Sequence, residues 1–446
     1  MAAYSDREAF IPYRRCDLIE LCVKDGQLPA TEVQKFRQFC SLLAAYYHFQ
    51  FHSYLETLKA NYAPFDPDAD TKSLRETSPE ERISMESQLV SDFKKILERA
   101  NYIPLSKASL RRAFKERSLI ALHTSVDFND FDQMACYYRG DTFKLASIKK
   151  FFRKVEKTVN VFERVALLLK FKNEAYFVNK KVKIESLSFT PGKTYVYLYK
   201  NIPKFDLEFL FPNVKTSMTW KDRLLFGVPA IGAAIPLILR VLPQLLLVLG
   251  VILFITIGPS PLEALRPSEK DLRDIVPVLL AILSLVVTLG GFAFKQYSSY
   301  KSKQIKFQKK VTETLFFKNL ASNASVFGAL IDAAEEEECK EILLVYYHLL
   351  TSNDELTAEQ LDNQIEVWMD EKFGTRIDFD INGPLKNLEA IQGKIIKDGA
   401  QKGRIPEVPL LKRDSQGKCH VLPLDDALAV IDYIWDNAFL FTKCRK

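Results

Sequence analysis

Two histidines and a glutamate are spaced so that one face of a helix could hold a metal ion. His48, His52 and Glu56 follow one another at intervals of four residues, and residues at this spacing lie on the same helix face. Two such imidazoles can chelate a metal, and a carboxylate one turn further on could complete the ligand set. The zincin pattern requires Glu directly after the first His, however, and residue 49 is Phe. Packed or half-exposed histidines on an aromatic helix are the alternative interpretation.

The rest of the chain contains no recognised catalytic or nucleotide-binding motif. His123, His348 and His420 are isolated, and the sequence lacks G-x-S-x-G, G-x-x-x-x-G-K-[ST] and G-x-G-x-x-G patterns. The seven cysteines form no C-x-x-C pair, which is typical of idle thiols in a reducing compartment. We therefore expect no cofactor and lean against an enzyme.

Two long apolar runs dominate the middle of the chain. Leu224–Ile257 contains Arg240 and Gln244 among apolar, Gly, Pro and Thr residues, and Ile275–Phe294 has 20 residues without a charge. A helix of about 20 apolar residues crosses a hydrocarbon core. The pattern predicts a two-span transmembrane hairpin over residues 221–297.

Three prolines divide the first of these runs. The predicted hairpin therefore has a kinked entry segment at 224–239 and spans at about 241–257 and 275–294. Arg240 would snorkel to the interface or line an oligomeric pathway.

Basic residues on both sides of the hairpin predict its orientation, because Lys and Arg flanks stay on the cytoplasmic side. We expect both termini to be cytoplasmic, at a bacterial inner or internal membrane, with the lipid bilayer as a partner. The predicted membrane-interface residues are Lys221, Arg223, Arg240, Lys295, Lys301 and Lys303.

Composition limits the other functions. The 446 residues are 48% hydrophobic and 26% charged, with a mean hydropathy of −0.07. These values exclude a transporter built mostly of spans. The net charge of +6 is too small and too mixed to indicate a nucleic-acid partner.

The chain before the hairpin divides into a helical region (1–116) and a β-rich region (117–220). Possible capping boxes, Thr31 with Gln34 and Ser78 with Glu81, predict two helix starts. Short β-branched and aromatic segments predict an antiparallel sheet packed on these helices. The predicted strands are Leu119–Val126, Gln133–Tyr138, Phe162–Phe171, Val182–Leu187 and Tyr195–Tyr199. The basic stretch Phe143–Lys157 is expected to be a loop, either solvated or touching anionic headgroups.

The chain after the hairpin (298–446) resembles a winged helix. The acidic run Glu335–Glu338 is expected to open its first helix, where acids suit the helix dipole. A capping box at Thr357 and Gln360 opens the second helix. A strand at Arg376–Ile381, a third helix and a hairpin within Lys394–Leu424 would follow. The third helix offers Lys386 and Asn387 beside Glu389, which argues against DNA recognition.

Three stretches together resemble a known family. They read DREAFIPYRRCDLIELC (Asp6–Cys22), YVYLYKNIPKFDLEFLFPNVKTSMTWKDRLLFGVP (Tyr195–Pro229) and ALIDAAEEEECKEILLVYYHLL (Ala329–Leu350). The chain resembles the family built on domain of unknown function 3754, which includes the transmembrane protein 143-like proteins. The resemblance implies a membrane protein and supplies no catalytic residue.

These observations predict an α+β membrane protein with a helical and antiparallel-sheet N-terminal part, a transmembrane hairpin and a winged-helix-like module. The expected function is a non-enzymatic scaffold or regulatory adaptor that binds an unknown protein partner. One alternative is a component of a small channel or transporter, which would require a homo-oligomer. Another is a membrane-associated, metal-dependent hydrolase that uses His48, His52 and Glu56.

Overall fold

The chain folds into two compact units, each built from separate parts of the sequence. The computed structural model describes residues 10–72, 74–75, 77–113, 123–150, 153–217, 269–395 and 406–438. The first unit comprises Met1–Lys115, Phe128–Leu207 and Lys318–Lys446, and the second comprises Glu116–Asp127 and Glu208–Phe317.

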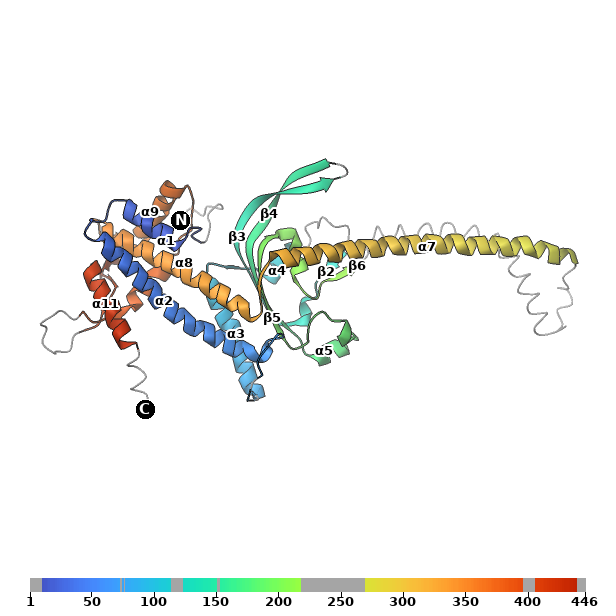
Figure 1. Cartoon of the computed structure of the whole chain (residues 1–446), viewed down its shortest axis with the longest axis horizontal. Helices are drawn as coiled ribbons and strands as arrows, with labels where there is room; N and C mark the ends of the chain where they lie inside the picture. The colour runs from blue at the N-terminus through green and yellow to red at the C-terminus, as the bar shows by residue number, and fades with distance from the viewer. Residues whose placement is uncertain are drawn as a thin grey trace. The chain divides into compact units, whose positions relative to one another are not determined.

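Helices from both ends of the chain share the core of the first unit. The N-terminal helices are α1 (Arg15–Lys24), α2 (Val33–Tyr62) and α3 (Pro79–Arg99), and they pack with α8 (Ala324–Thr351). Figure 1 shows α8 running beside α2. Phe39 of α2 stacks on Tyr346 of α8 with 4.2 Å between ring centroids. Burial of such aromatic pairs explains why chain segments so far apart in sequence form one body.

Two of the three predicted capping boxes are confirmed. Ser78 and Glu81 cap α3 reciprocally, and Thr357 and Gln360 cap α9 (Ala358–Phe373) in the same way. The prediction at Thr31 is wrong, because α2 begins one residue later than that box requires and has no side-chain cap.

The first unit also contains a five-stranded antiparallel sheet in the order β1-β3-β4-β5-β7. Its strands are β1 (Ile103–Pro104), β3 (Phe131–Lys150), β4 (Arg153–Phe171), β5 (Thr194–Pro203) and β7 (Asn319–Ser322). The strands predicted at Gln133–Tyr138, Phe162–Phe171 and Tyr195–Tyr199 are confirmed as parts of β3, β4 and β5. Tyr195, Tyr197 and Tyr199 stack along one face of β5.

Two predictions for this region are wrong. The basic stretch Phe143–Lys157 is not a loop along its length, since β3 and β4 remain paired out to Lys150 and Arg153. Main-chain hydrogen bonds sustain a strand without an apolar pattern, so charge was a poor guide here. Val182–Leu187 is not a strand either; it contains a 3₁₀ turn at Ile184–Ser186.

Three helices and a small sheet form the C-terminal part of the first unit. After α8 come β8 (Leu356–Thr357), α9, α10 (Asn382–Ala390), β11 (Leu411–Arg413), β12 (Lys418–Val421) and α11 (Leu424–Asn437). The sheet order is β11-β12-β8. The third strand of this sheet lies between α8 and α9. The predicted strand at Arg376–Ile381 is wrong, because only Ile377 forms an isolated bridge there. The remaining short elements of the unit are α4 (Lys107–Ala113), α5 (Glu174–Asn179), β9 (Gln392–Gly393) and β10 (Val408–Pro409).

Close packing of β9 on α11 predicts a large effect for a small substitution. A Cβ atom at Gly393 would lie 2.7 Å from the Val430 carbonyl oxygen and 3.3 Å from Tyr433 Cδ1. We expect Gly393→Ala to lower the free energy of unfolding by about 1–3 kcal/mol, as overpacking does, in urea titrations. Gly328→Ala in α8, where no atom lies within 4 Å, is the control, and equal midpoints for both variants would contradict the prediction.

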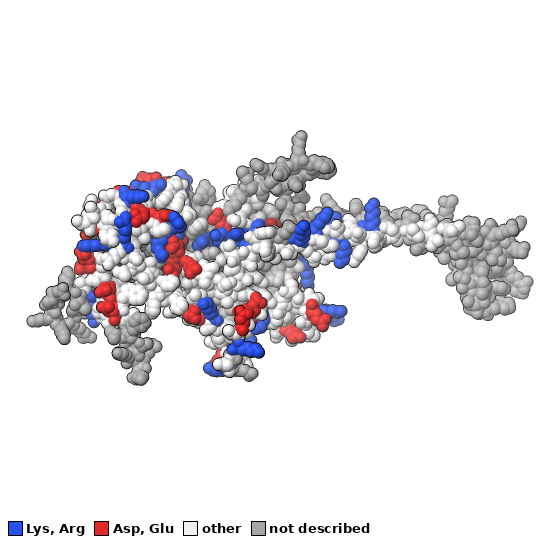
Figure 2. Space-filling view, in the orientation of Figure 1, with Lys and Arg blue, Asp and Glu red and all other residues white. Residues whose placement is uncertain are grey.

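The second unit contains β2 (His123–Ser125) paired with β6 (Lys215–Ser217), and most of α7 (Glu269–Lys318). Phe209 packs edge-on against Phe307 of α7, with 5.2 Å between centroids. Lys and Arg side chains, drawn blue in Figure 2, follow α7. Large apolar side chains on α7 are exposed, including Leu283, Val287 and Phe294.

The prediction of a two-span transmembrane hairpin is contradicted. Among the described residues, no helix has the length and apolar character needed to span a bilayer. The run Ile275–Phe294 lies within the 50-residue helix α7, which has charged residues before and after the run. Leu224–Ile257, the first predicted run, lies outside the described residues. The predicted integral-membrane location is contradicted by the same finding.

Candidate functional site

Helix α8 carries a row of glutamates, Glu335–Glu338 with Glu341, which we call the carboxylate row; three of its five members are buried. Glu337, Glu338 and Glu341 are only 2%, 6% and 7% exposed. The prediction that this run opens a helix is wrong, because α8 starts at Ala324 and has no acid in its first turn. A helix dipole therefore does not account for the row, and burial of so many carboxylates requires partners from other elements.

Four members of the row have such partners. Glu335 Oε2 lies 2.9 Å from His48 Nδ1, which is the distance of a hydrogen bond or an ion pair. Glu336 accepts the main-chain N–H of Arg15 at 2.8 Å. Glu337 accepts the main-chain N–H of Ile11 at 2.5 Å and pairs within α8 with Lys340 at 2.7 Å. Glu338 forms a two-point ion pair with Arg99 of α3. These contacts hold the N-terminal helices on α8.

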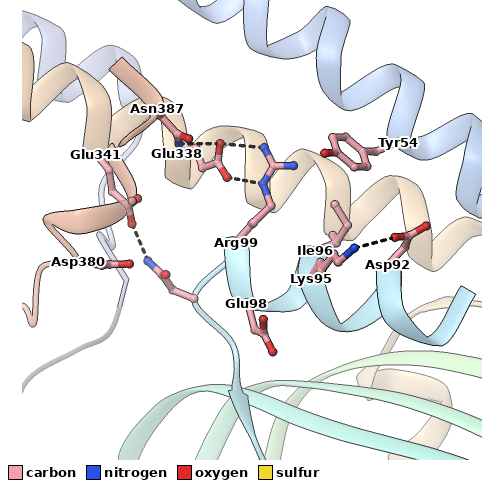
Figure 3. Close-up of a pocket in the computed structure, with 12 residues that line it drawn as sticks. Tyr54, Asp92, Lys95, Ile96, Glu98, Arg99, Glu338, Glu341, Asp380 and Asn387 are labelled. Atoms are coloured by element: carbon pink, nitrogen blue, oxygen red, sulfur yellow. Dashed lines mark hydrogen bonds and ion pairs between the residues drawn. The ribbon is translucent and has the colours of Figure 1, made fainter. Parts of the chain in front are cut away.

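The end of the row opens into a cavity of about 340 Å³ in the first unit. Figure 3 shows Glu338 and Glu341 of α8 facing side chains from α3 and from the segment that leads into α10. The lining residues are Tyr54, Asp92, Lys95, Ile96, Glu98, Arg99, Asn101, Glu338, Glu341, Asp380, Gly383 and Asn387.

The two cations of this cavity are already paired with carboxylates that also line it. Arg99 Nη2 lies 2.9 Å from Glu338 Oε2, and Lys95 Nζ lies 3.7 Å from Asp92 Oδ1. Burial disfavours the charged guanidinium of Arg99, but the hydrogen bond and charge of Glu338 outweigh that effect, so the pKa of Arg99 is raised. Arg99 is therefore held by Glu338, whereas Lys95 contacts Asp92 from a side chain that is 62% exposed.

Three lining carboxylates, Glu98, Glu341 and Asp380, form no ion pair within the described part of the chain. Glu341 accepts one hydrogen bond, from Asn101 Nδ2 at 2.8 Å. Burial raises the pKa of Glu341 well above its usual value, and the nearby charges of Glu337, Glu338 and Asp380 add to the rise, whereas the Asn101 bond opposes it. Glu341 is thus held toward its neutral form, and neither it nor the exposed Asp380 has a counter-ion among the described residues.

An aromatic ring lies at the rim of the same cavity. Tyr54 of α2 is 42% exposed, and its ring centroid lies 5.1 Å from the Arg99 guanidinium carbon. Tyr54 thus already contacts one planar cation, and its exposed part places an aromatic surface beside the lining carboxyl groups.

The predicted metal ligands lie on α2, outside this cavity. His48, His52 and Glu56 are exposed, and His48 is turned to Glu335 of α8. Glu56 lies 3.2 Å from Lys59. Within the ranges that the structure describes, no group of three or more His, Cys, Asp or Glu residues is arranged to hold a metal.

The predicted membrane-interface residues fall into two groups. Lys221, Arg223 and Arg240 lie outside the described residues. Lys295, Lys301 and Lys303 lie on α7, with Lys295 and Lys301 exposed. Lys295, Lys301 and Lys303 are not among the lining residues of the cavity at the carboxylate row.

Sequence reasoning missed the residues that form the cavity. The available signal was the run of four glutamates in a 28-residue helix that is apolar over much of its length, because charged side chains are rarely buried unless they are paired. Arg99 and Asn101 could not be found in this way, because they are about 240 residues from their partners.

One family model matches the chain. Residues 162–325 match the family described as "Protein of unknown function (DUF3754)". The match extends from β4 to the second residue of α8 and does not include the carboxylate row or the lining residues of the cavity. No solved structure matches the chain.

Proposed function

We propose that the protein is a non-enzymatic adaptor, and that the cavity beside the carboxylate row binds an arginine or lysine side chain of a protein partner. The observation that carries this proposal is that the carboxyl groups of Glu341 and Asp380 have no counter-ion in the described part of the chain, since the lining cations Arg99 and Lys95 pair with Glu338 and Asp92. A partner cation would provide the counter-charge that Glu341 lacks.

The residue types in the cavity support binding rather than catalysis. The lining residues include no Ser, Thr, Cys or His, which are the usual nucleophiles and neutral-pH bases. They do include carboxylate and amide oxygens on several elements, with a tyrosine face at the rim. This combination recognises a guanidinium through charge-assisted hydrogen bonds and ring stacking.

We also propose that the chain groups with the transmembrane protein 143-like proteins. Two stretches that carry that resemblance, Asp6–Cys22 and Ala329–Leu350, contact one another through Glu336 and Glu337. A shared structural role for the two stretches supports the placement.

Binding of short peptides to the full chain tests the adaptor proposal. Acetyl-Gly-Arg-Gly-amide should bind more tightly than its lysine counterpart, and its neutral citrulline counterpart should bind at least tenfold more weakly, in calorimetric titrations. Glu341→Gln and Asp380→Asn should each weaken arginine-peptide binding about tenfold, since a bond to a charged group contributes about 1.5–3 kcal/mol.

Asp378→Asn is the matched control for this experiment. Asp378 is exposed and lies two residues before Asp380, but it does not line the cavity. Its substitution should leave binding unchanged. Equal binding of the arginine and citrulline peptides would contradict the proposal, and free methylguanidine binding as tightly as the peptide would contradict a protein partner.

A further inference from the structure

A short extended segment at the N-terminus lies on α8 in the manner of a bound peptide. This N-terminal segment, residues 10–15, ends at the first residue of α1 and contacts the carboxylate row at a different place from the cavity. Side chains of α8, rather than another strand, satisfy its main-chain groups. The Ile11 N–H donates to Glu337 Oε1 at 2.5 Å, and the Ile11 carbonyl accepts from Lys340 Nζ at 2.5 Å.

The two side chains that bind the main-chain groups of Ile11 are deeply buried. Glu337 and Lys340 are 2% and 4% exposed, and they also pair with each other at 2.7 Å. One carboxylate and one ammonium thus present an acceptor and a donor to the two polar groups of a single residue. That arrangement recognises an extended main chain in one register, whatever side chain the residue carries.

Alternate side chains of the segment supply the rest of the contact. Ile11 is 3% exposed, whereas Pro12 and Arg14 are exposed. Tyr13 stacks on Phe373 at the end of α9, with 3.9 Å between centroids, and its hydroxyl shares a hydrogen bond of 2.5 Å with Thr375 Oγ1. The Arg15 N–H then donates to Glu336 at 2.8 Å. Anchors at every second residue are typical of extended peptides in a groove.

We propose that α8 and the end of α9 form a peptide-binding site for an aliphatic-x-Tyr sequence. The chain's own N-terminal segment fills this site, and the same segment of a second copy enters it in exchange. The seated segment itself shows the chemistry that the site accepts. A segment covalently joined to its site has a high effective concentration, so a competing copy binds weakly until the internal contact is loosened. This inference does not depend on the proposed function.

Exchange can be tested with a fluorescent peptide of residues 5–15 added to the full chain. Tyr13→Ala removes an anchor from the internal segment and leaves the site intact, so this variant should bind the peptide at least tenfold more tightly than the unmodified chain does, by anisotropy. A peptide N-methylated at Ile11 lacks the donor to Glu337 and should bind at least tenfold more weakly. A peptide with Ala at Tyr13 should also lose affinity.

A second measurement keeps the test decisive if Tyr13→Ala fails to fold. Hydrogen exchange at residues 10–15 of the unmodified chain should accelerate as unlabelled peptide is added, because the internal segment is displaced. No acceleration up to millimolar peptide, or equal binding of the N-methylated peptide, would overturn the proposal.

Discussion

Replacing Lys340 with methionine is expected to lower the free energy of unfolding by about 3–5 kcal/mol, the cost of leaving one charge of a buried pair without its partner. Glu337 would remain 2% exposed without a counter-ion, and the Ile11 carbonyl would lose the donor that lies 2.5 Å away. Urea titrations of the full chain, followed by circular dichroism, measure this change.

An exposed pair with the same spacing is the control for Lys340. Lys59 and Glu56 of α2 also stand three residues apart, with 3.2 Å between their charged atoms, but their side chains are 46% and 58% exposed. Lys59→Met should therefore change stability by about 0–1 kcal/mol. Replacing both Glu337 and Lys340 with Met should restore much of the loss, since an apolar pair often equals a buried ionic one. Comparable effects at Lys340 and Lys59 would contradict a buried, organising role for the pair.

Acidification is expected to destabilise the first unit through His348 of α8. This histidine is 3% exposed, and burial lowers its pKa from 6.5 to about 4, with Asp25 opposing the shift. Its Nδ1 lies 3.3 Å from Gln364 Nε2, and its Nε2 has no hydrogen-bond partner in the described part of the chain. The unfolded chain therefore binds a proton that the native protein excludes.

The sign of this dependence follows from that difference in bound protons. As the pH falls from 6.5 to about 4, the unfolded state is favoured increasingly. Over this range His348 lowers the free energy of unfolding by about 3 kcal/mol in total. Other groups titrate in the same range, and the raised pKa of Glu341 acts in the opposite direction. The contribution of His348 is isolated by comparing stability-against-pH curves of the unmodified chain and His348→Gln. His348→Gln should have a flatter stability-against-pH curve over this range. His52→Gln, at an exposed site on α2, is the control and should keep the slope of the unmodified chain. Parallel curves for all three proteins would refute the assignment to His348.

Local sequence signals predicted some features of the fold well. The capping boxes at Ser78 and Thr357 involve atoms three residues apart, so the residues themselves determine the geometry. The alternation that predicted β5 is equally local, and Tyr195, Tyr197 and Tyr199 do share one face. The Thr31 box failed because a matching residue pair does not require the helix to start there.

Signals that depend on distant partners misled the prediction or were missed. Glu335–Glu338 resembles the acidic first turn of a helix, yet α8 begins eleven residues earlier, at Ala324. Nothing near Glu338 in the sequence identifies Arg99 as its partner. Likewise, the length and apolarity of Ile275–Phe294 predicted a separate span, whereas α7 continues through this run to Lys318. The candidate site was therefore not predictable, because its chemistry arises where α3, α8 and the segment before α10 meet.

Proton release on binding tests the claim that Glu341 lacks a counter-ion in the cavity and receives one from the partner. Calorimetric titrations with acetyl-Gly-Arg-Gly-amide would be run at pH 6 in two buffers with different ionisation enthalpies. A guanidinium beside Glu341 favours the ionised carboxylate, so binding should release a proton, and the observed heat should differ between the two buffers. Glu341→Gln should remove that difference and weaken binding. Identical heats in both buffers for the unmodified chain, together with unchanged affinity in Glu341→Gln, would contradict the account.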